Sequence, residues 1–188
     1  MSDAVSPLDG ASFDGLVKLR DMGPTGMLTV RGTLDDTKFG AALLKATGVE
    51  LPGKLRILGT ADMRIAWMSP DELLVICPYA QAAKMSRALS DALSDQHALV
   101  VNVSDTRVAL SVEGAATREV LAKLTPVDVA PDAMPAGTIR RTRLAQVPAA
   151  FWFDADGNAT VIAFRSVAAY VFDLLQSAAH PDSAVAYF

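Results

Sequence analysis

The chain has 188 residues, 51% of them hydrophobic, and a formal net charge of −4 at pH 7. This length allows one well-buried domain or two small halves that share a core, and the apolar content argues against disorder outside the ends. The small basic group Arg140, Arg141 and Arg143 is too limited to indicate nucleic-acid binding, because phosphate neutralisation supplies most of that affinity.

The apolar runs, the N-terminus and the cysteine content indicate in which compartment the protein is located and whether it enters a membrane. The apolar runs are short, and none reaches the roughly 20 residues that span a bilayer. The N-terminus, MSDAVSPLDGASFDG, is acidic and has no apolar core, so we expect no secretion signal. Cys77 is the single cysteine, which excludes an internal disulfide and is typical of a reducing compartment. We therefore expect a cytoplasmic protein that does not enter a membrane.

Residues 1–26 predict an N-terminal arm. Their apolar residues follow no sustained period, and prolines and glycines interrupt them. We expect this arm to be flexible or to lie along a partner. A C-terminal tail is predicted at 181–188, after a single domain at 27–180 that consists of two halves, about 27–97 and 98–180.

The first half predicts a strand at 27–32 and then a helix. Asp35 or Asp36 can cap the start of this helix and Gly48 can end it in the left-handed conformation. Its expected apolar face contains Phe39, Leu43 and Leu44. Short strands are predicted at 55–58, 63–67 and 72–77, with a turn at 69–72. A helix with a narrow apolar stripe of Met85, Leu89 and Leu93 is predicted over 79–95.

The second half repeats this order more loosely. A buried strand at 99–103 and a second strand at 107–112 flank a polar turn, and a helix at 115–124 and a proline-rich connection at 125–137 follow. The remaining strands are predicted at 138–146, 149–153 and 159–164, the last two joined by the DADGN turn at 154–158. The closing helix has its apolar stripe at Val167, Tyr170, Val171, Leu174, Leu175 and Ala178.

Adjacent strands often form hairpins in this order of elements, although helices are interleaved with them. A purely parallel sheet is therefore excluded, because parallel neighbours need a crossover. The order predicts an α+β fold built from two split βαβ halves of the ferredoxin-like type.

Several motifs resemble one known family. WMSPDELL at 67–74 matches the pattern W-x-S/G-P-D-E-x-L-L, and residues 101–114 match V-x-V-S-D-x-R-x-x-L-x-x-x-G. The helix start at 165–170 matches R-S-x-A-x-Y/L, and SPL at 6–8 resembles the N-terminal arm of the same family. Over about 27–178, the chain resembles the gamma subunits of heterotetrameric sarcosine oxidases, relatives of the folate-dependent aminomethyltransferases of the glycine cleavage system.

The chain departs from these patterns at three places. Asn102 stands where an acid is common, and Ala115 replaces the usual proline after Gly114. The G-Y-T-G-E-D-G folate signature of true aminomethyltransferases is absent, and a hydrophobic hairpin at 151–164 occupies the corresponding position. The resemblance thus implies the folate-binding fold of aminomethyltransferases without the carboxylate that contacts folate.

The resemblance also implies a function. In this family the four-subunit enzyme demethylates sarcosine oxidatively to glycine, forms peroxide and passes the one-carbon unit to tetrahydrofolate. FAD, FMN, NAD and tetrahydrofolate would be held by the partner subunits, and this chain would hold no cofactor. It would pack as a non-catalytic structural subunit against alpha and beta, with delta in the same complex. We also expect the isolated chain to form homo-oligomers over an exposed apolar patch.

Reactive residues are few. His97 and His180 lie in no metal-binding spacing, His97 at a helix end and His180 in a polar tail, and we expect neither to bind a metal. Cys77 ends an apolar strand, which is typical of a small buried side chain rather than a nucleophile. We therefore expect no catalytic, cofactor-binding or metal-binding residue on this chain.

The NVSDTR motif at 102–107 offers Asp105 and Arg107 as candidates. Turn chemistry by Ser104 and Asp105 is the favoured interpretation, with pairing at an interface or catalysis as alternatives.

Trp67 and Trp152 are candidates for a partner surface, because one face of the FWF strand is expected to lie outside the core. Ordinary core filling is nevertheless the favoured interpretation for each tryptophan.

Two other functions stay open. One is a free-standing folate-binding protein of the aminomethyltransferase type, although the K-G-C-Y-x-G-Q-E segment of such proteins does not occur here. The other is a minimal one-carbon transferase that acts alone. It needs a carboxylate facing a pterin, for which Asp105 and Asp128 are the candidates.

Overall fold

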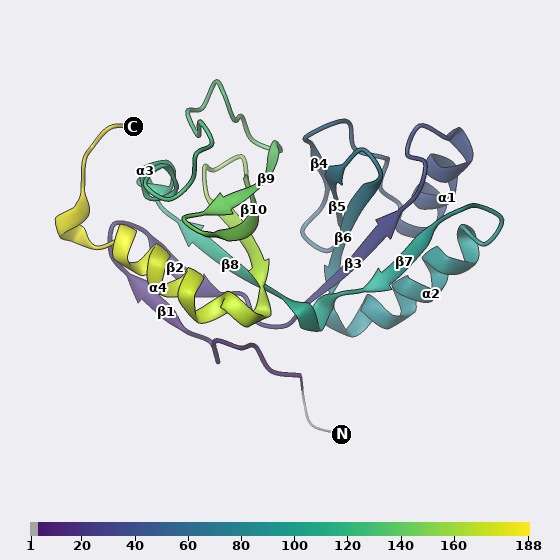
Figure 1. The fold of residues 1–188 in the computed structure, drawn as a ribbon, viewed down its shortest axis with the longest axis horizontal. Coiled ribbons are helices and arrows are strands. Elements are labelled where there is room, and N and C mark those ends of the chain that lie inside the picture. The colour runs from purple at the N-terminus through teal and green to yellow at the C-terminus, as the bar shows by residue number, and fades with distance from the viewer. Residues whose placement is uncertain (1–3) are drawn as a thin grey trace. The chain divides into compact units, whose positions relative to one another are not determined.

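The computed structural model describes residues 4–188, which form two compact units (Figure 1). Unit 2 comprises residues 25–104, and unit 1 comprises the described residues on both sides of it, up to Pro24 and from Asp105 onward. This division differs from the predicted halves, because the N-terminal segment joins unit 1 and residues 98–104 join unit 2. Among the described residues, no helix is long and apolar enough to cross a membrane.

Within residues 4–188, unit 2 contains a five-stranded antiparallel sheet with two α-helices on one face (Figure 1). Its elements are β3 (Thr25–Arg31), α1 (Thr37–Thr47), β4 (Ile57–Gly59), β5 (Arg64–Ser69), β6 (Glu72–Pro78), the 3-10 turn η1 (Tyr79–Gln81), α2 (Ala82–Ala92) and β7 (Leu99–Asn102). The strand order is β4-β5-β6-β3-β7. Apart from the added edge strand β4, this is the predicted ferredoxin-like βαββαβ arrangement.

Local signals define helix α1 at both ends. The Asp36 side chain accepts the N–H of Lys38 at 2.8 Å, which makes Asp36 the N-cap. Gly48 ends the helix with φ 73°, in the left-handed conformation that glycine adopts without strain. Phe39 and Leu43 are buried as predicted, but Leu44 is exposed. The predicted apolar face was therefore one residue too wide.

The core of unit 2 lies between the helices and one face of its sheet. Alternate residues of β3 and β6 point into it, as the two-residue period of a strand requires. The buried members of this core are Leu28, Val30, Leu34, Phe39, Leu43, Ile65, Leu73, Val75, Cys77, Ala82, Leu89 and Leu93.

Unit 1 contains, within the described residues, a six-stranded antiparallel sheet in the order β1-β2-β8-β11-β10-β9. Its elements are β1 (Ser12–Asp14), β2 (Lys18–Asp21), β8 (Arg107–Glu113), α3 (Thr117–Ala122), β9 (Ile139–Leu144), β10 (Val147–Phe153), β11 (Ala159–Phe164), the 3-10 turn η3 (Arg165–Val167), α4 (Ala168–Ala178) and the 3-10 turn η4 (Pro181–Ser183). The 3-10 turn η2 (Ser104–Thr106) precedes β8. The DADGN hairpin is confirmed, since Phe153 pairs with Ala159 across it.

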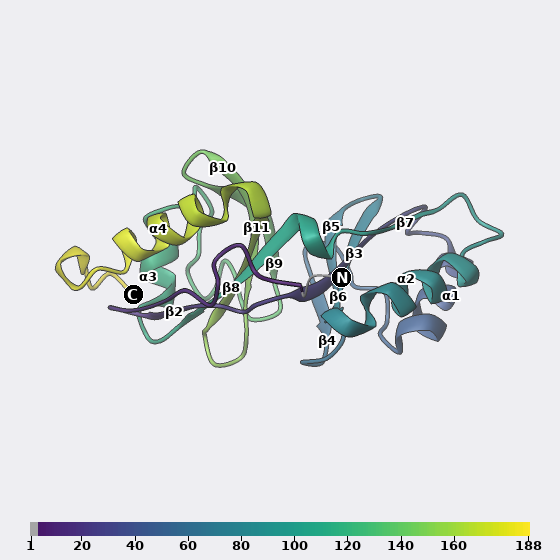
Figure 2. The same cartoon turned by 90° about the horizontal axis from the view of Figure 1, so that it is seen from below.

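The N-terminal segment supplies strands to unit 1, where the sequence predicted an arm. β2 lies beside β8 (Figure 2) and pairs with it, with Leu19 opposite Val112. Val17 and Leu19 are buried in the core. Strands β8, β10 and β11 follow the ferredoxin-like order, and β2 takes the position of the closing strand that would otherwise follow α4. The edge of β8 is thereby paired. Residues 1–3 of the predicted arm lie outside the described residues.

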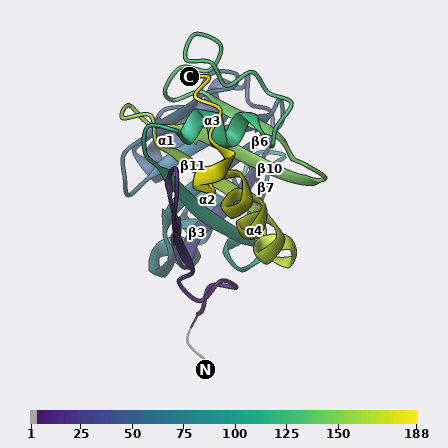
Figure 3. The ribbon, with the colours of Figure 1, turned by 90° about the vertical axis from the view of Figure 1, so that its left-hand side faces the viewer.

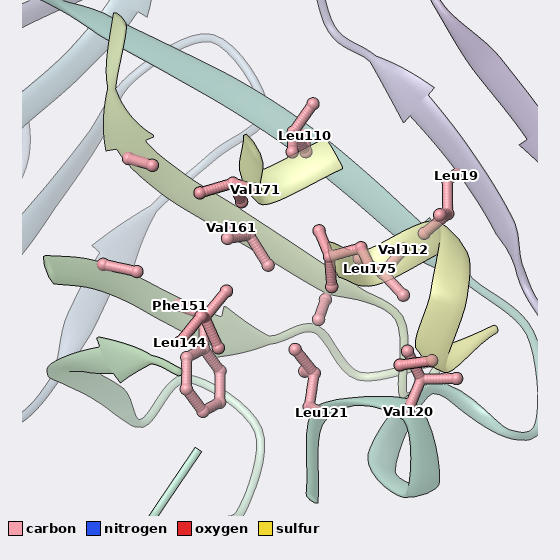
Figure 4. Close-up of a cluster of buried hydrophobic side chains, with 14 of the residues drawn as sticks. Leu19, Leu110, Val112, Val120, Leu121, Leu144, Phe151, Val161, Val171 and Leu175 are labelled. Carbon is pink, nitrogen blue, oxygen red and sulfur yellow. The ribbon is translucent and has the colours of Figure 1, made fainter. Parts of the chain in front are cut away.

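The core of unit 1 lies between α3, α4 and the sheet (Figure 4). Val171 and Leu175 of α4 point into it, as the apolar stripe predicted, and Phe172 is also buried. Tyr170, which the sequence placed in the stripe, is 44% exposed. The stripe is therefore shifted by part of a turn from the predicted one.

Candidate functional site

A groove of about 550 Å³ opens at one end of the unit 2 sheet. Its lining comes from three separate segments: the end of β3, the β5–β6 turn and the residues that lead into β7. The lining residues are Arg31, Gly32, Thr33, Asp71, His97, Ala98 and Leu99. A smaller hollow of about 320 Å³ shares Thr33 and His97 with it, so His97 borders both.

The charged groups of the groove form an ion-pair network. The Arg31 guanidinium lies 2.7 Å from a carboxylate oxygen of Glu72 and 3.6 Å from one of Asp71. The Ser69 hydroxyl in turn donates to the other oxygen of Asp71 at 2.6 Å. The hydrogen bond to Glu72, together with the two negative charges, raises the pKa of Arg31. This network holds the side chains at the rim of the groove in place and neutralises the charge of Arg31.

Strand β7 leads out of the groove and forms one edge of the sheet (Figure 1). Its sequence, Leu-Val-Val-Asn, contains no charge, and Leu99 and Val101 are 53% and 40% exposed. The prediction of a buried strand here is wrong, because only Val100 packs against the core of unit 2. We call Leu99, Val101 and the adjoining Arg31, Asp71 and His97 the β7 surface.

The outer side of β7 presents main-chain groups. The Val103 N–H donates to the Met27 carbonyl at 2.8 Å, and in the antiparallel register Leu99 and Val101 therefore point their main-chain groups toward β3. Val100 and Asn102 point theirs away from β3. Within the described residues no strand pairs with this side, so it can accept an additional strand.

The other sheet edges in the described part of the chain are protected. β1 and β4 have three residues each. β9 carries Arg140, Arg141 and Arg143, and charges of this kind discourage pairing between sheet edges. The β7 edge is therefore the one suited to association.

The first part of the NVSDTR motif, which contains Asn102 and Ser104, serves the structure of unit 2. The Ser104 hydroxyl accepts the Met27 N–H at 2.9 Å and donates to the Asn102 side chain at 2.6 Å. The Asn102 side-chain oxygen also accepts the main-chain N–H of Ser104 at 3.1 Å. Asp105 is exposed on η2, and Arg107 stacks over the Phe164 ring, with its guanidinium carbon 5.2 Å from the ring centre.

The other candidate residues are dispersed. Cys77 is buried, and burial raises the pKa of its thiol, which disfavours the reactive thiolate at neutral pH. Asp128 accepts the N–H of Ala130 at 2.9 Å in a local turn. His180 is exposed and caps η4 by accepting the Asp182 N–H. In residues 4–188, no group of three or more His, Cys, Asp and Glu side chains is arranged to hold a metal ion.

Both tryptophans pack against the rest of the chain. Trp67 is half-buried against the core of unit 2. Trp152 is 4% exposed, and Phe151 and Phe153 on the opposite face of β10 are fully buried. The expectation that one face of this strand lies outside the core is therefore wrong.

Sequence analysis considered His97 only as a metal ligand, which it did not expect, and it predicted neither the groove nor the other residues that line it. Arg31 and Asp71 are separated by forty residues of chain, and only the pairing of β3 with β6 brings them together. The one available signal was the SPDE turn, which places Asp71 and Glu72 at a strand start.

Comparison with known proteins identifies related sequences. Residues 31–181 match the sequence model of the sarcosine oxidase, gamma subunit family. A sarcosine oxidase subunit gamma from Corynebacterium sp. strain P-1 is 33% identical over 146 residues, which cover 75% of this chain and 69% of the relative. The subunit of the same name from an Arthrobacter species is 31% identical over 143 residues, with the same coverage of 75% and 69%.

Solved structures confirm the predicted fold class. A chain of the heterotetrameric sarcosine oxidase from Corynebacterium sp. U-96, in complex with pyrrole 2-carboxylate, is 26% identical with a TM-score of 0.84, covering 97% of this chain and 98% of that chain. The glycine cleavage system aminomethyltransferase T from Bartonella henselae is 11% identical with a TM-score of 0.58, covering 82% of this chain and 44% of that chain. The second likeness concerns the fold alone.

Proposed function

Because the chain belongs to the sarcosine oxidase gamma subunit family, we propose that it is a non-catalytic subunit that stabilises a cytoplasmic heterotetrameric sarcosine oxidase. Its partners are the alpha and beta subunits, with delta in the same complex. The partners hold FAD, FMN, NAD and tetrahydrofolate. The assembled enzyme demethylates sarcosine to glycine, forms peroxide and passes the one-carbon unit to tetrahydrofolate.

The β7 surface is the observation that carries this proposal. It combines an uncharged edge strand, the exposed side chains of Leu99 and Val101, and an adjoining groove. Exposed apolar side chains beside unpaired main-chain groups favour association with another protein. A partner segment that pairs with Val100 and Asn102 would cover Leu99 and Val101 at the same time.

The groove supports a structural role in a second way. Its guanidinium is already engaged by Glu72 and Asp71, so it is held in place rather than positioned to meet a substrate. Asp128, which a one-carbon transferase would need to face a pterin, is engaged in a local turn. The chemistry is therefore assigned to the partner subunits.

The test is assembly with and without this chain. The alpha, beta and delta subunits are produced with or without it, and each preparation is assayed for bound flavin, thermal unfolding and sarcosine-dependent peroxide per flavin. We expect the preparation without it to lose assembly and to unfold at lower temperature. Equal stability and activity in both preparations would contradict the stabilising role.

The isolated chain provides the second half of the test. Equilibrium dialysis against flavin and against tetrahydrofolate is expected to show no stoichiometric binding. Binding of one tetrahydrofolate per chain, without recovery of any partner subunit, would instead support the free-standing folate-binding protein.

A further inference from the structure

The segment that follows α4 presents apolar side chains outward. Val185, Tyr187 and Phe188 are 67%, 78% and 48% exposed. The Tyr187 and Phe188 rings contact each other edge to face, with centres 5.0 Å apart. These residues do not belong to the packed core of unit 1.

A polar clamp holds the main chain of this segment against α3 (Figure 3). We define the C-terminal clamp as Glu119, Lys123 and Ser183. The two carboxylate oxygens of Glu119 accept the N–H groups of Val185 and Ala186, each at 2.8 Å. Glu119 is 7% exposed and belongs to the short helix α3, 66 residues before Val185 in the sequence.

Lys123 completes the clamp from the same side. Its Nζ lies 3.0 Å from the Glu119 carboxylate and donates to the Ser183 carbonyl at 2.7 Å. It also donates to the Ala178 carbonyl at 3.1 Å, at the end of α4. The Ser183 hydroxyl donates to the same Ala178 carbonyl at 2.8 Å. The clamp thus fixes the path of the chain from α4 to Ala186.

The clamp contacts main-chain atoms at Val185 and Ala186, so it orders the backbone while leaving the apolar side chains uncovered. A peptide that is already held in one conformation loses less conformational freedom when it binds. Aromatic side chains presented in this way are typical of the anchors that dominate protein interfaces. The side chains of 185–188 are all uncharged, so a mainly apolar receptor would match them.

We propose that the clamped segment 185–188 is an anchor that inserts Tyr187 and Phe188 into an apolar pocket on a partner subunit of the heterotetramer. This proposal rests on the proposed function, and it names a second contact that is separate from the β7 surface. The clamp acts as a positioning device, and the aromatic pair supplies the binding contact.

The test uses the full chain produced together with its partner subunits. The double variant Tyr187→Ser/Phe188→Ser is compared with the parent for recovery of the partners through a tag on this chain, and for dissociation of the complex on dilution. We expect at least a tenfold weaker association. Tyr170→Ser is the matched control, because Tyr170 is an exposed aromatic residue of α4 that lies outside the clamp.

The outcomes separate the two proposals. If the parent chain recovers no partner subunit, the proposed function fails. If the parent recovers them and the double variant recovers them equally well, the anchor is wrong while the function stands. Circular dichroism and thermal unfolding of the isolated variants show whether the fold is intact, as we expect for these exposed positions.

A double-mutant cycle tests the role of the clamp. Glu119→Gln is expected to weaken association severalfold in the parent chain and to have no further effect in the Tyr187→Ser/Phe188→Ser background, because its influence passes through the anchor. Equal effects of Glu119→Gln in both backgrounds would show that the clamp does not position the anchor.

Discussion

The hydroxyl oxygen of Ser104 lies 2.9 Å from the main-chain nitrogen of Met27, and this contact joins the end of β7 to the start of β3. Both residues are buried. Val103 donates to the Met27 carbonyl beside it, so the pairing of the two strands continues past the last residue of β7. The β7 edge, which carries the proposed association surface, is therefore held in register at its far end by a side chain.

Ser104→Ala is expected to destabilise unit 2 by about 1–3 kcal/mol, because the buried Met27 N–H loses its acceptor. Urea unfolding of the isolated chain measures this change. Ser90→Ala is the control, since Ser90 is exposed on α2 and its replacement is expected to change stability by less than about 0.5 kcal/mol. An equal loss of stability in Ser104→Ala and Ser90→Ala would contradict the stabilising role of the Ser104 hydroxyl.

The Arg31–Glu72 pair is predicted to matter more than the Arg31–Asp71 pair. Glu72→Gln is expected to cost about 1 kcal/mol, because it removes the charge of a buried carboxylate 2.7 Å from the guanidinium. Asp71→Asn is expected to cost about 0–0.5 kcal/mol, since that contact is longer and exposed. Chemical unfolding at low and high salt distinguishes them, and an equal loss in both variants would argue against this ranking.

Two glycines give opposite predictions for replacement by alanine. At Gly26 a Cβ atom would lie 2.8 Å from the carbonyl oxygen of Cys77 and 2.9 Å from that of Pro78, so Gly26→Ala forces β3 away from β6. We expect a loss of about 1–3 kcal/mol. At Gly40 in α1 nothing lies within 4 Å, and Gly40→Ala is expected to add about 0.5–1 kcal/mol. Thermal unfolding of the two variants provides the comparison.

The C-terminal clamp is predicted to open in acid. The N–H of Val185, with help from Lys123 and Ala186, lowers the pKa of Glu119 below its ordinary value of 4.5. A carboxyl whose pKa falls on folding stabilises the folded form above the unfolded pKa, and this contribution is lost as pH drops through the folded pKa. The clamp should therefore persist at neutral pH and release below pH 4.5.

Amide resonances of Val185 and Ala186, followed by NMR from pH 7 downward, measure this release. The transition should disappear in Glu119→Gln, which carries no titrating carboxyl at this position. A transition with a midpoint above 4.5 would contradict the direction of the shift.

The β7 edge is predicted to respond to a single charge. Val101→Lys places a positive charge on the β7 edge, as the arginines do on β9, and such a charge discourages pairing with another strand. We expect this variant to assemble with the partner subunits at least tenfold more weakly. The fold should be unaffected, because Val101 is 40% exposed. Thr106→Lys, at an exposed position on η2 outside the β7 surface, is the control. Retention of full assembly by Val101→Lys would place the interface elsewhere.

The isolated chain gives a related expectation. If Leu99 and Val101 drive association, the parent chain should form homo-oligomers at high concentration and Val101→Lys should not. Light scattering measures this difference.

Local interactions explain which elements could be predicted from the sequence. Helix α1 begins at an Asp cap and ends at a left-handed glycine, and the 154–158 hairpin closes around a short turn, so neighbouring residues determine both. The α+β class followed from the spacing of such elements. The burial of Tyr170 and Leu44 was predicted wrongly, because helical periodicity alone does not show how wide a face the sheet covers.

The sequence by itself therefore determined the elements, the fold class and the family, since each depends on patterns between near neighbours. Only the tertiary structure decided that residues 18–21 complete the sheet of unit 1, that β7 is an exposed edge, and that Glu119 meets the main chain of Val185. These features depend on pairings between segments far apart in the chain. Their partners are selected by hydrogen-bond geometry and the shared core, and no local motif encodes them.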